Sequence, residues 1–262
     1  MNFLHSFIPY PVAFGFFGIT IRWYSICVVL GIILAVWLVS HLARKRKIES
    51  DDVLDLTFWV VIGGIIGARL YEVLFINWWY YQSNPLNIIK IWNGGIAIHG
   101  GIIAGVLVLG FWSRAKKFSF WLWADLLVIG LAVGQVIGRW GNYFNQENFG
   151  RPTNLPWGIP IEQVNRSFEF LQSSFFNPTF LYESILSMLS LLILLWLWKR
   201  RVSVGVVASV YLINYGLIRF GMEFIRIDGT PIILGLRLPS LISILMIICG
   251  LVFVGVRMKK ST

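Results

Sequence analysis

Long apolar runs dominate the chain, and shorter segments rich in charged residues, glycine or proline separate them. Each run has about the 20 residues that a helix needs to cross the hydrocarbon core of a bilayer. The runs are too long and too continuous for the alternating strands of a membrane β-barrel, so the pattern predicts helices. Seven spans are expected, at residues 18–42, 53–76, 95–112, 120–140, 180–198, 204–222 and 238–256.

Composition agrees with a membrane protein. Hydrophobic residues make up 57% of the 262 positions and charged residues only 13%, and the mean hydropathy is +0.75. These values exclude an ordinary water-soluble domain. We therefore predict an all-α, polytopic membrane helical bundle that forms a single integral membrane domain over residues 1–262. Residues 142–177 are expected to be an external loop, which forms a small external cap with residues 77–93.

Basic clusters follow alternate spans, at residues 44–47, 114–117, 199–201 and 257–260. The positive-inside rule makes these segments cytoplasmic, which predicts an outside N-terminus and a cytoplasmic C-terminus. A net charge of +10 can indicate nucleic-acid binding, but basic residues beside apolar runs more often orient helices against anionic lipid. We expect a membrane partner and no nucleic acid.

Three further expectations concern the N-terminal segment, the two cysteines and cofactor binding. The N-terminal segment lacks a basic region and a small-residue cleavage site, so no signal peptide is expected to be removed. Cys27 and Cys249 each lie in an apolar run and are expected to be small core residues. No metal or other cofactor is implied, because one intramembrane histidine with scattered carboxylates is not a ligand set.

Ionisable side chains occur inside the spans, mostly towards the predicted outer ends. A buried arginine costs roughly 3 kcal/mol at a helix centre, so it needs a partner or an anionic ligand. Two pairs have spacings that also allow purely local ion pairs, and that structural alternative stays open for them. The residues concerned are Arg69 and Glu72, His99, Arg139, Glu183, and Arg219 and Glu223.

Two glycine-rich segments surround some of these groups. Residues 138–150, GRWGNYFNQENFG, combine three glycines with Asn142, Asn145 and Glu147 at the outer end of the fourth span. Residues 94–101, GGIAIHGG, place glycines around His99, which lets a helix or a lipid headgroup approach the imidazole. The first segment predicts a site for a polar ligand, and the second makes His99 a catalytic candidate.

These segments, in this order and topology, resemble those of the prolipoprotein diacylglyceryl transferases of the bacterial cytoplasmic membrane. The family signature is similar to G-R-x-G-N-x-x-N-x-E-x-x-G, and residues 138–150, the signature segment, match every fixed position. The resemblance spans the whole chain. Further landmarks agree in order: Arg22-Trp23-Tyr24, Gly67-Ala68-Arg69-Leu70-Tyr71, His99, Pro178 with Leu181-Tyr182-Glu183, and Tyr215-Gly216 with Arg219 and Glu223.

Some positions depart from the family pattern. Asn177 and Phe180 stand where histidine and glutamine are common, and Tyr143 replaces a usual phenylalanine. Leu238-Pro239-Ser240 replaces a common Met-Gly-Gln. None of these changes a charged residue of the signature, so they bear on headgroup contacts and substrate preference more than on the reaction.

The resemblance implies transfer of the diacylglyceryl group of phosphatidylglycerol to the lipobox cysteine thiol of a prolipoprotein, which gives a thioether and glycerol 1-phosphate. Arginine suits the phosphate because its planar fork binds two oxygens and stays charged. The thiol needs a base or a positive field to become a thiolate. The implied catalytic residues are His99, Arg139, Arg219 and Tyr24; the implied binding residues are Arg139, Asn142, Asn145, Glu147, Gly150, Tyr215, Glu223, Arg69, Tyr182 and Glu183.

Two other classes fit the composition. A transporter of an anionic lipid or small anion would use buried arginines, but polar residues would then be expected in the inner halves of the spans as well. A structural subunit would bury ion pairs without needing the full signature segment. The signature therefore favours the transferase.

Overall fold

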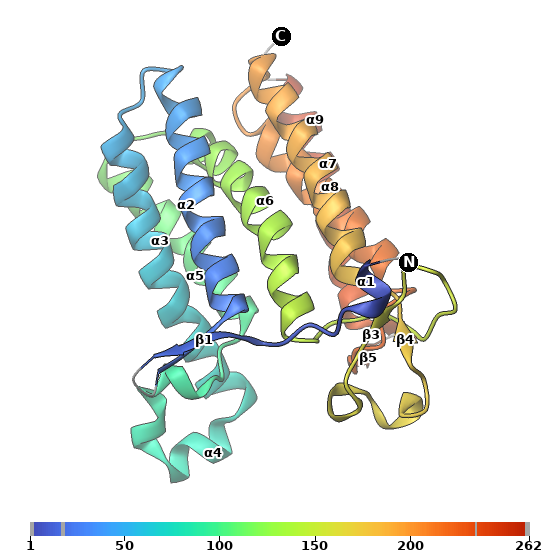
Figure 1. Cartoon of the computed structure of the whole chain (residues 1–262). Coiled ribbons are helices and arrows are strands. Elements are labelled where there is room, and N and C mark those ends of the chain that lie inside the picture. Colours follow the sequence, from blue (N-terminus) through green and yellow to red (C-terminus); the bar gives the residue numbers. More distant parts are fainter. Residues whose placement is uncertain (1–2, 17–18, 234, 260–262) are drawn as a thin grey trace. The chain divides into compact units, whose positions relative to one another are not determined.

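The computed structural model describes residues 3–16, 19–233 and 235–259, most of them helical (Figure 1). The long helices are α2 (Trp23–Arg44), α3 (Ser50–Tyr71), α5 (Ile98–Ala115), α6 (Phe120–Phe144), α7 (Thr179–Lys199), α8 (Val206–Met222) and α9 (Leu238–Lys259). Shorter helices are α1 (Phe3–Ser6), α4 (Trp78–Ser83), a π-helical turn (Glu72–Ile76) and single turns at Pro85–Ile88, Ile91–Asn93, Gln163–Asn165 and Phe168–Phe170. Three antiparallel pairs are β1 (Val12–Phe16) with β2 (Ile19–Arg22), β3 (Ile159–Pro160) with β4 (Phe175–Phe176), and β5 (Ile232–Ile233) with β6 (Leu236–Arg237).

The helices confirm the predicted membrane bundle. Six of them are long and apolar enough to cross a bilayer, and α8 is a shorter apolar helix of 17 residues. The prediction was wrong at the start of the first span, because the segment from Val12 to Arg22 pairs as a hairpin and the helix begins at Trp23. The helix of the fourth predicted span, α6, continues to Phe144, so residues 138–144 of the signature segment are helical.

Contacts divide the chain into two compact units, which are described separately. The first contains the chain up to Leu38 and from Leu127 onward, and the second contains Val39–Leu126. The predicted cap draws on both units, and it stays a prediction, as does the single domain.

In the second unit, α3 and α5 pack through small residues. A methyl group added to Gly67 would overlap Ala104, and one added to Gly100 would overlap the carbonyl oxygen of Gly67. Close backbone approach of this kind replaces the hydrophobic driving force that membrane helices lack. At the other end of the pair, Asp55 accepts a hydrogen bond from Trp112 Nε1 at 2.9 Å and pairs with Lys116 at 3.2 Å.

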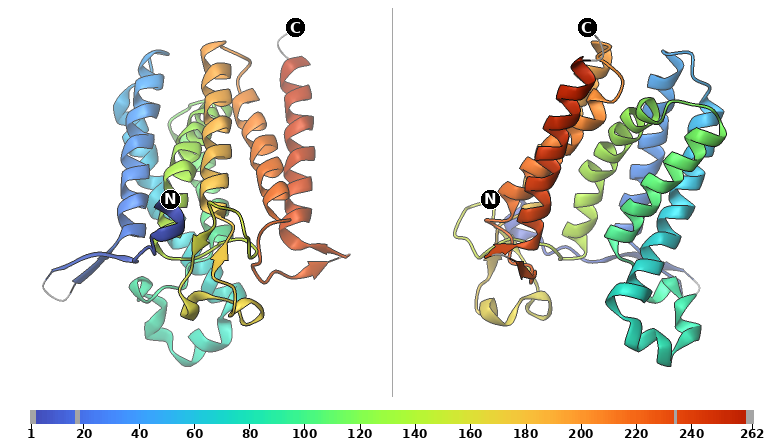
Figure 2. Two further views of the ribbon diagram at one scale, coloured as in Figure 1. Left: turned by 45° about the vertical axis from the view of Figure 1, so that its right-hand side comes forward. Right: turned by 180° about the vertical axis from the view of Figure 1, so that it is seen from behind.

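In the first unit, α7, α8 and α9 are neighbours (Figure 2). Glycines again bring α8 and α9 together: a methyl group on Gly216 would come within 2.8 Å of the Ser243 carbonyl oxygen, and one on Gly250 within 2.7 Å of that of Ser209. α6 contacts α7 through the Ser184 hydroxyl, which donates to the Val136 carbonyl at 2.9 Å. These contacts hold the ends of α6, α7 and α8 that carry the charged residues.

A small core supports the loop that follows α6. Its buried members come from α6, the loop and α7, and Tyr143 stacks on Phe180 with ring centroids 4.4 Å apart. Buried Gln146 donates to the Pro9 carbonyl at 2.8 Å and accepts from the Glu162 amide at 2.7 Å. The two departures Tyr143 and Phe180 therefore pack against each other. The core residues are Tyr143, Phe149, Ile159, Ile161, Phe176 and Phe180.

Candidate functional site

The signature segment turns sharply where α6 ends. Gln146 and Asn148 have φ values of 52° and 57°, in the left-handed region, and the Asn148 carbonyl accepts a hydrogen bond from the Thr179 hydroxyl. Gly150 follows in a tight position, where a methyl group would come within 2.8 Å of both Asn177 and Ile225. Only glycine fits there. The last glycine of the signature segment therefore lets the chain pass between the residue before α7 and the turn after α8.

One carboxylate lies between two arginines from different elements. Glu183 of α7 is 3% exposed, and its Oε2 pairs with Arg139 of α6. Its Oε1 pairs with Nη1 of Arg226 at 2.8 Å. Burial alone would lower the pKa of Arg226, but Glu183 and Asp228 outweigh it and raise that pKa above its ordinary value, so Arg226 stays charged.

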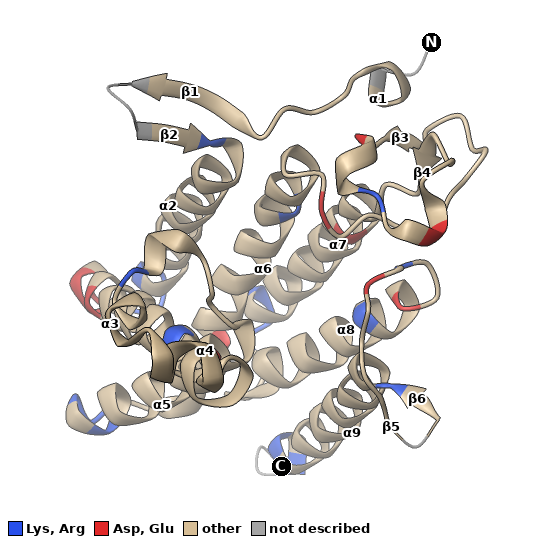
Figure 3. Cartoon of the chain, turned by 90° about the horizontal axis from the view of Figure 1, so that it is seen from below, with Lys and Arg blue, Asp and Glu red and all other residues tan. Residues whose placement is uncertain are grey.

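A second carboxylate is held in the same way. Glu223 is 5% exposed; its Oε2 lies 2.5 Å from Nη1 of Arg219 and its Oε1 lies 2.8 Å from Nε of Arg237. The local Arg219–Glu223 pair expected from the sequence is confirmed. Arg237, on β6, makes it part of a larger cluster. Figure 3 marks the basic and acidic residues at these ends of α6, α7 and α8 and on β6.

The four arginines differ in how many donors they have left. Arg226 uses Nε for Asp228, Nη1 for Glu183 and Nη2 for Asn148. Arg237 likewise donates from all three nitrogens, to the Thr230 hydroxyl and to carbonyl oxygens that include that of Asp228. Every guanidinium nitrogen of these two arginines has a partner within the protein, which suits them to positioning the carboxylates.

Arg139 and Arg219 are less engaged. Besides its ion pair, Arg139 makes one long hydrogen bond of 3.4 Å to Asn142, and within the described part of the chain Arg219 contacts only Glu223. Their side chains are 23% and 18% exposed, so both are accessible. Each keeps guanidinium donors for a ligand. These free donors are the groups of the network that can bind an anion.

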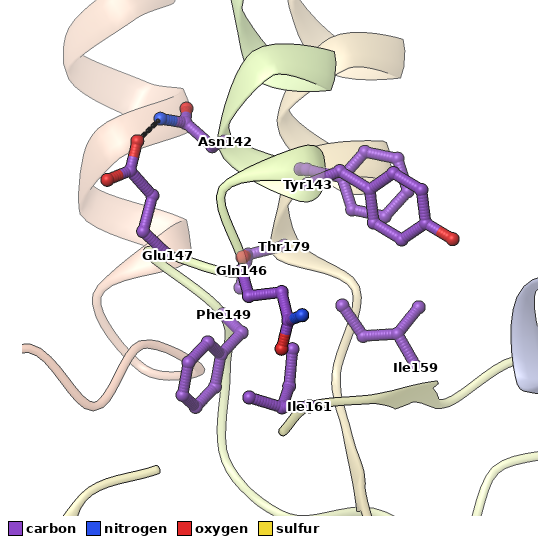
Figure 4. A pocket seen from close by; sticks show the side chains of 9 residues that line it. Asn142, Tyr143, Gln146, Glu147, Phe149, Ile159, Ile161 and Thr179 are labelled. Carbon is purple, nitrogen blue, oxygen red and sulfur yellow. Dashed lines mark hydrogen bonds between the residues drawn. The ribbon is translucent and has the colours of Figure 1, made fainter. Parts of the chain in front are cut away.

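Amide and carboxylate groups from the signature segment lie beside Arg139. Asn142 donates to Glu147 Oε1 at 2.7 Å (Figure 4). Asn145 Nδ2 donates to the same oxygen at 3.5 Å. The Oδ1 of Asn145 is buried and has no hydrogen-bond partner among the described residues. The enclosed cavity next to these groups is only about 10 Å³, enough for a single water molecule, so it is not itself the substrate site.

The three tyrosines expected at the site lie on α2, α7 and α8. Tyr24 packs on Gly141, where a methyl group would come within 2.8 Å of its ring, and it is close enough to Arg139 and Glu147 for electrostatic interaction. Tyr215 stacks on Tyr211, with centroids 6.1 Å apart. The Tyr182 hydroxyl accepts from Trp157 Nε1 at 2.8 Å and donates weakly to Asn177 at 3.4 Å.

Arg69 belongs to the second unit and does not pair with Glu72, so the local ion pair considered for them is wrong. Its guanidinium donates to main-chain carbonyls of the loop between α3 and α5, including those of Ile88 at 2.9 Å and Gly94 at 2.7 Å. Glu72 instead accepts from Asn77 at 2.5 Å. Several carbonyl oxygens of this loop accept hydrogen bonds from the Arg69 guanidinium, whereas Glu72 would offer a single carboxylate from the same helix. The loop carbonyls therefore take the place of Glu72 as partners of Arg69. A substrate role for Arg69 stays a prediction.

His99 also belongs to the second unit, in the first turn of α5. It is exposed, and its ring lies beside Tyr71 with centroids 5.9 Å apart. Gly100 lets this turn pack against α3, since a methyl group there would overlap Tyr71 Cβ. The expectation that the glycines let a helix approach His99 is met by α3.

The first unit thus brings together Arg139, Glu183, Arg219 and Glu223, and adds Arg226 and Arg237, which sequence reasoning missed. Both lie outside the apolar spans. An arginine there carries no cost of membrane burial, so these two did not stand out in the sequence. The spacing of Arg226 three residues after Glu223 was the available signal. No cluster of metal-ligating side chains occurs among the residues that the structure describes.

Comparison with known proteins identifies the family. A family model described as prolipoprotein diacylglyceryl transferase matches residues 11–256. The chain belongs to the prolipoprotein diacylglyceryl transferase family. Relatives named phosphatidylglycerol–prolipoprotein diacylglyceryl transferase include one from Thermosynechococcus vestitus, 41% identical over 235 residues, which cover 88% of this chain and 87% of the relative. Another, from Acaryochloris marina, is 44% identical over 246 residues, with coverage of 93% and 89%.

Membership of the prolipoprotein diacylglyceryl transferase family decides between the classes that the composition left open. A relative from Nostoc is 43% identical over 250 residues and carries the same name, and nothing in these names supports the transporter alternative. The chain is a multi-pass membrane protein of a transferase family. Which of its residues act in the reaction is a separate question, taken up next.

Proposed function

We propose that this chain transfers the diacylglyceryl group of phosphatidylglycerol to the lipobox cysteine of a prolipoprotein. The thiolate sulfur attacks the glyceryl carbon that bears the phosphate. The carbon–sulfur thioether bond forms as the carbon–oxygen bond breaks, and glycerol 1-phosphate leaves with the electron pair. The family and the names of its relatives support this reaction, and the arginine–glutamate cluster supports where it takes place.

The observation that carries the site assignment is the difference between the arginines. Arg226 and Arg237 use all three guanidinium nitrogens within the protein, whereas Arg139 and Arg219 use fewer and lie next to buried carboxylates that fix them. A leaving phosphate gains negative charge as the bond breaks, and preorganised guanidinium groups stabilise that charge without reorganisation. Arg139 and Arg219 therefore bind the phosphate, and Glu183 and Glu223 hold them in place.

The remaining groups have supporting roles in this proposal. Asn142, Asn145 and Glu147 order the glycerol headgroup, and the unpartnered Asn145 Oδ1 is available to accept from a headgroup hydroxyl. Tyr24 and Tyr215 donate to the phosphate. His99 removes the thiol proton, with the positive field of the arginines as the alternative means of forming the thiolate. The thiol comes from the substrate, so neither Cys27 nor Cys249 takes part.

The proposed setting is the bacterial cytoplasmic membrane. The basic clusters support an outside N-terminus and a cytoplasmic C-terminus, a topology in which Arg139 and Arg219 lie at the outer leaflet. Prolipoproteins present their lipobox cysteine at the end of a membrane-inserted signal segment, so both substrates reach the site from the lipid phase.

A reconstituted assay tests the reaction. Purified chain in vesicles that contain phosphatidylglycerol is incubated with a lipobox peptide, and glycerol phosphate release and peptide mass are measured. Release is expected only with the cysteine peptide, matched by a mass increase equal to the diacylglyceryl group. A control peptide with serine at that position should give neither signal. Release of glycerol phosphate with the serine peptide would indicate a lipid hydrolase and contradict the proposal.

A further inference from the structure

An apolar groove of about 490 Å³ lies between α7 and α8, outside the charged cluster. Tyr182 and Leu186 line it from α7, Leu217 and Gly221 line it from α8, and Ile225 lines it from the turn that follows α8. The two sets follow the four-residue spacing of one helix face, so the groove runs along the helix pair. The site residues Glu183, Arg219 and Glu223 come from the same two helices at neighbouring positions, and they do not line the groove.

The end of the groove beside Tyr182 and Ile225 is polar. The Tyr182 hydroxyl is linked to Trp157 and Asn177, and the Ile225 carbonyl accepts from the Arg151 amide at 2.8 Å. The groove is therefore apolar along its length with the Tyr182 hydroxyl at one end, which matches an acyl chain attached to a polar headgroup.

Gly221 keeps the groove open. It is exposed, and a methyl group added to it meets no atom within 4 Å, so a larger side chain would enter empty space without disturbing the backbone. The volume lies within the range of small-ligand sites, about 300–1,000 Å³. A leucine at this position would occupy the middle of the groove.

We propose that the α7–α8 groove binds one acyl chain of the phospholipid donor, and that Gly221 determines the chain length it accepts. The inference rests on the proposed function, since the donor is the phosphatidylglycerol of that reaction. The acyl chain in the groove holds the lipid while its phosphate contacts Arg219, on α8, and Arg139, which Glu183 of α7 holds. Binding of the acyl chain in the groove then affects KM for the lipid more than kcat.

The test compares Gly221→Leu with Gly255→Leu. Gly255 on α9 is also exposed and also has no atom within 4 Å of an added methyl group, which makes it a matched control. KM for dipalmitoyl and dihexanoyl phosphatidylglycerol is measured in mixed micelles with the full chain. Gly221→Leu should raise KM for the dipalmitoyl lipid roughly tenfold and leave that for the dihexanoyl lipid unchanged. Gly255→Leu should change neither, and an equal effect on both lipids, or no effect, would overturn the proposal.

A second readout separates this proposal from the reaction itself. Phosphatidylglycerol with a photoactivatable acyl chain should crosslink to Leu217 or Leu186 in the wild type and in Gly255→Leu, and much less in Gly221→Leu. If the wild type releases no glycerol phosphate, the proposed function is wrong. The crosslink alone then shows whether the groove binds an acyl chain. A raised KM for the lipobox peptide, with unchanged crosslinking, would assign the groove to the peptide and refute the acyl-chain proposal.

Discussion

At the scale of single residues, Arg139 shows why charge and geometry are separate requirements. Its pair with Glu183 fixes one edge of the guanidinium, and the other donors face no partner stronger than Asn142. Arg139→Lys keeps the charge but loses the planar fork that binds two phosphate oxygens. We expect glycerol phosphate release to fall roughly 100-fold, with most of the change in kcat.

The control for this substitution is Arg114→Lys, at an exposed arginine of α5 outside the site. It should retain full activity. Activity of Arg139→Lys within twofold of wild type would remove Arg139 from the phosphate site. The lipid-transfer rate in vesicles is the measurement in both cases.

His99 tests the origin of the thiolate. If its imidazole takes the thiol proton, His99→Gln should slow transfer and change the dependence of the rate on pH. His41→Gln, at the exposed histidine near the end of α2, should leave the pH profile intact. A His99→Gln enzyme with a normal rate and an unchanged profile would assign thiol activation to the arginine field instead.

The sequence predicted individual site residues where burial in a span makes a charge conspicuous. Arg139, Glu183, Arg219 and Glu223 were found in this way. Arg226 was not, because it follows α8 in a loop, and nothing in local spacing reveals that its partner is Glu183, 43 positions away. Partners that meet only through folding are the part of the site that a single sequence does not show.

At the scale of helices, glycine at the α8–α9 contact allows a direct prediction. A methyl group at Gly250 would collide with Ile213 and the Ser209 carbonyl, whereas Gly255 on the same helix faces open space. Gly250→Leu should therefore destabilise the protein by about 1–3 kcal/mol, and Gly255→Leu should be nearly neutral. Thermal unfolding in detergent measures both, and equal melting temperatures would contradict the packing.

Helix positions were predicted to within a few residues because the apolar runs are long and end at charges or prolines. The hairpin of β1 and β2 was missed, since its two strands are short and largely apolar. Their pairing depends on cross-strand contacts, which hydropathy does not report. The π-helical turn at Glu72–Ile76 was likewise taken as an ordinary continuation of the second span.

At the scale of the whole molecule, the seven spans expected from the sequence and the basic clusters predict a topology with the signature segment outside. Cysteine labelling tests it, and the two native cysteines must first be replaced. Cys27→Ser with Cys249→Ser should keep full transfer activity, because the reacting sulfur belongs to the prolipoprotein. A folded but inactive double variant would show that a protein thiol participates.

In that cysteine-free protein, Asn154→Cys in the loop after α6 and Ser203→Cys between α7 and α8 report opposite sides of the membrane. A membrane-impermeant maleimide added to intact spheroplasts should label the cysteine at 154 and label that at 203 only after lysis. This pattern follows from the basic cluster 199–201, which the positive-inside rule retains in the cytoplasm. Labelling in the reverse order would move Arg139 and Arg219 to the cytoplasmic leaflet, away from the side where a translocated lipobox cysteine is presented, and the proposed reaction would then lack access to its acceptor.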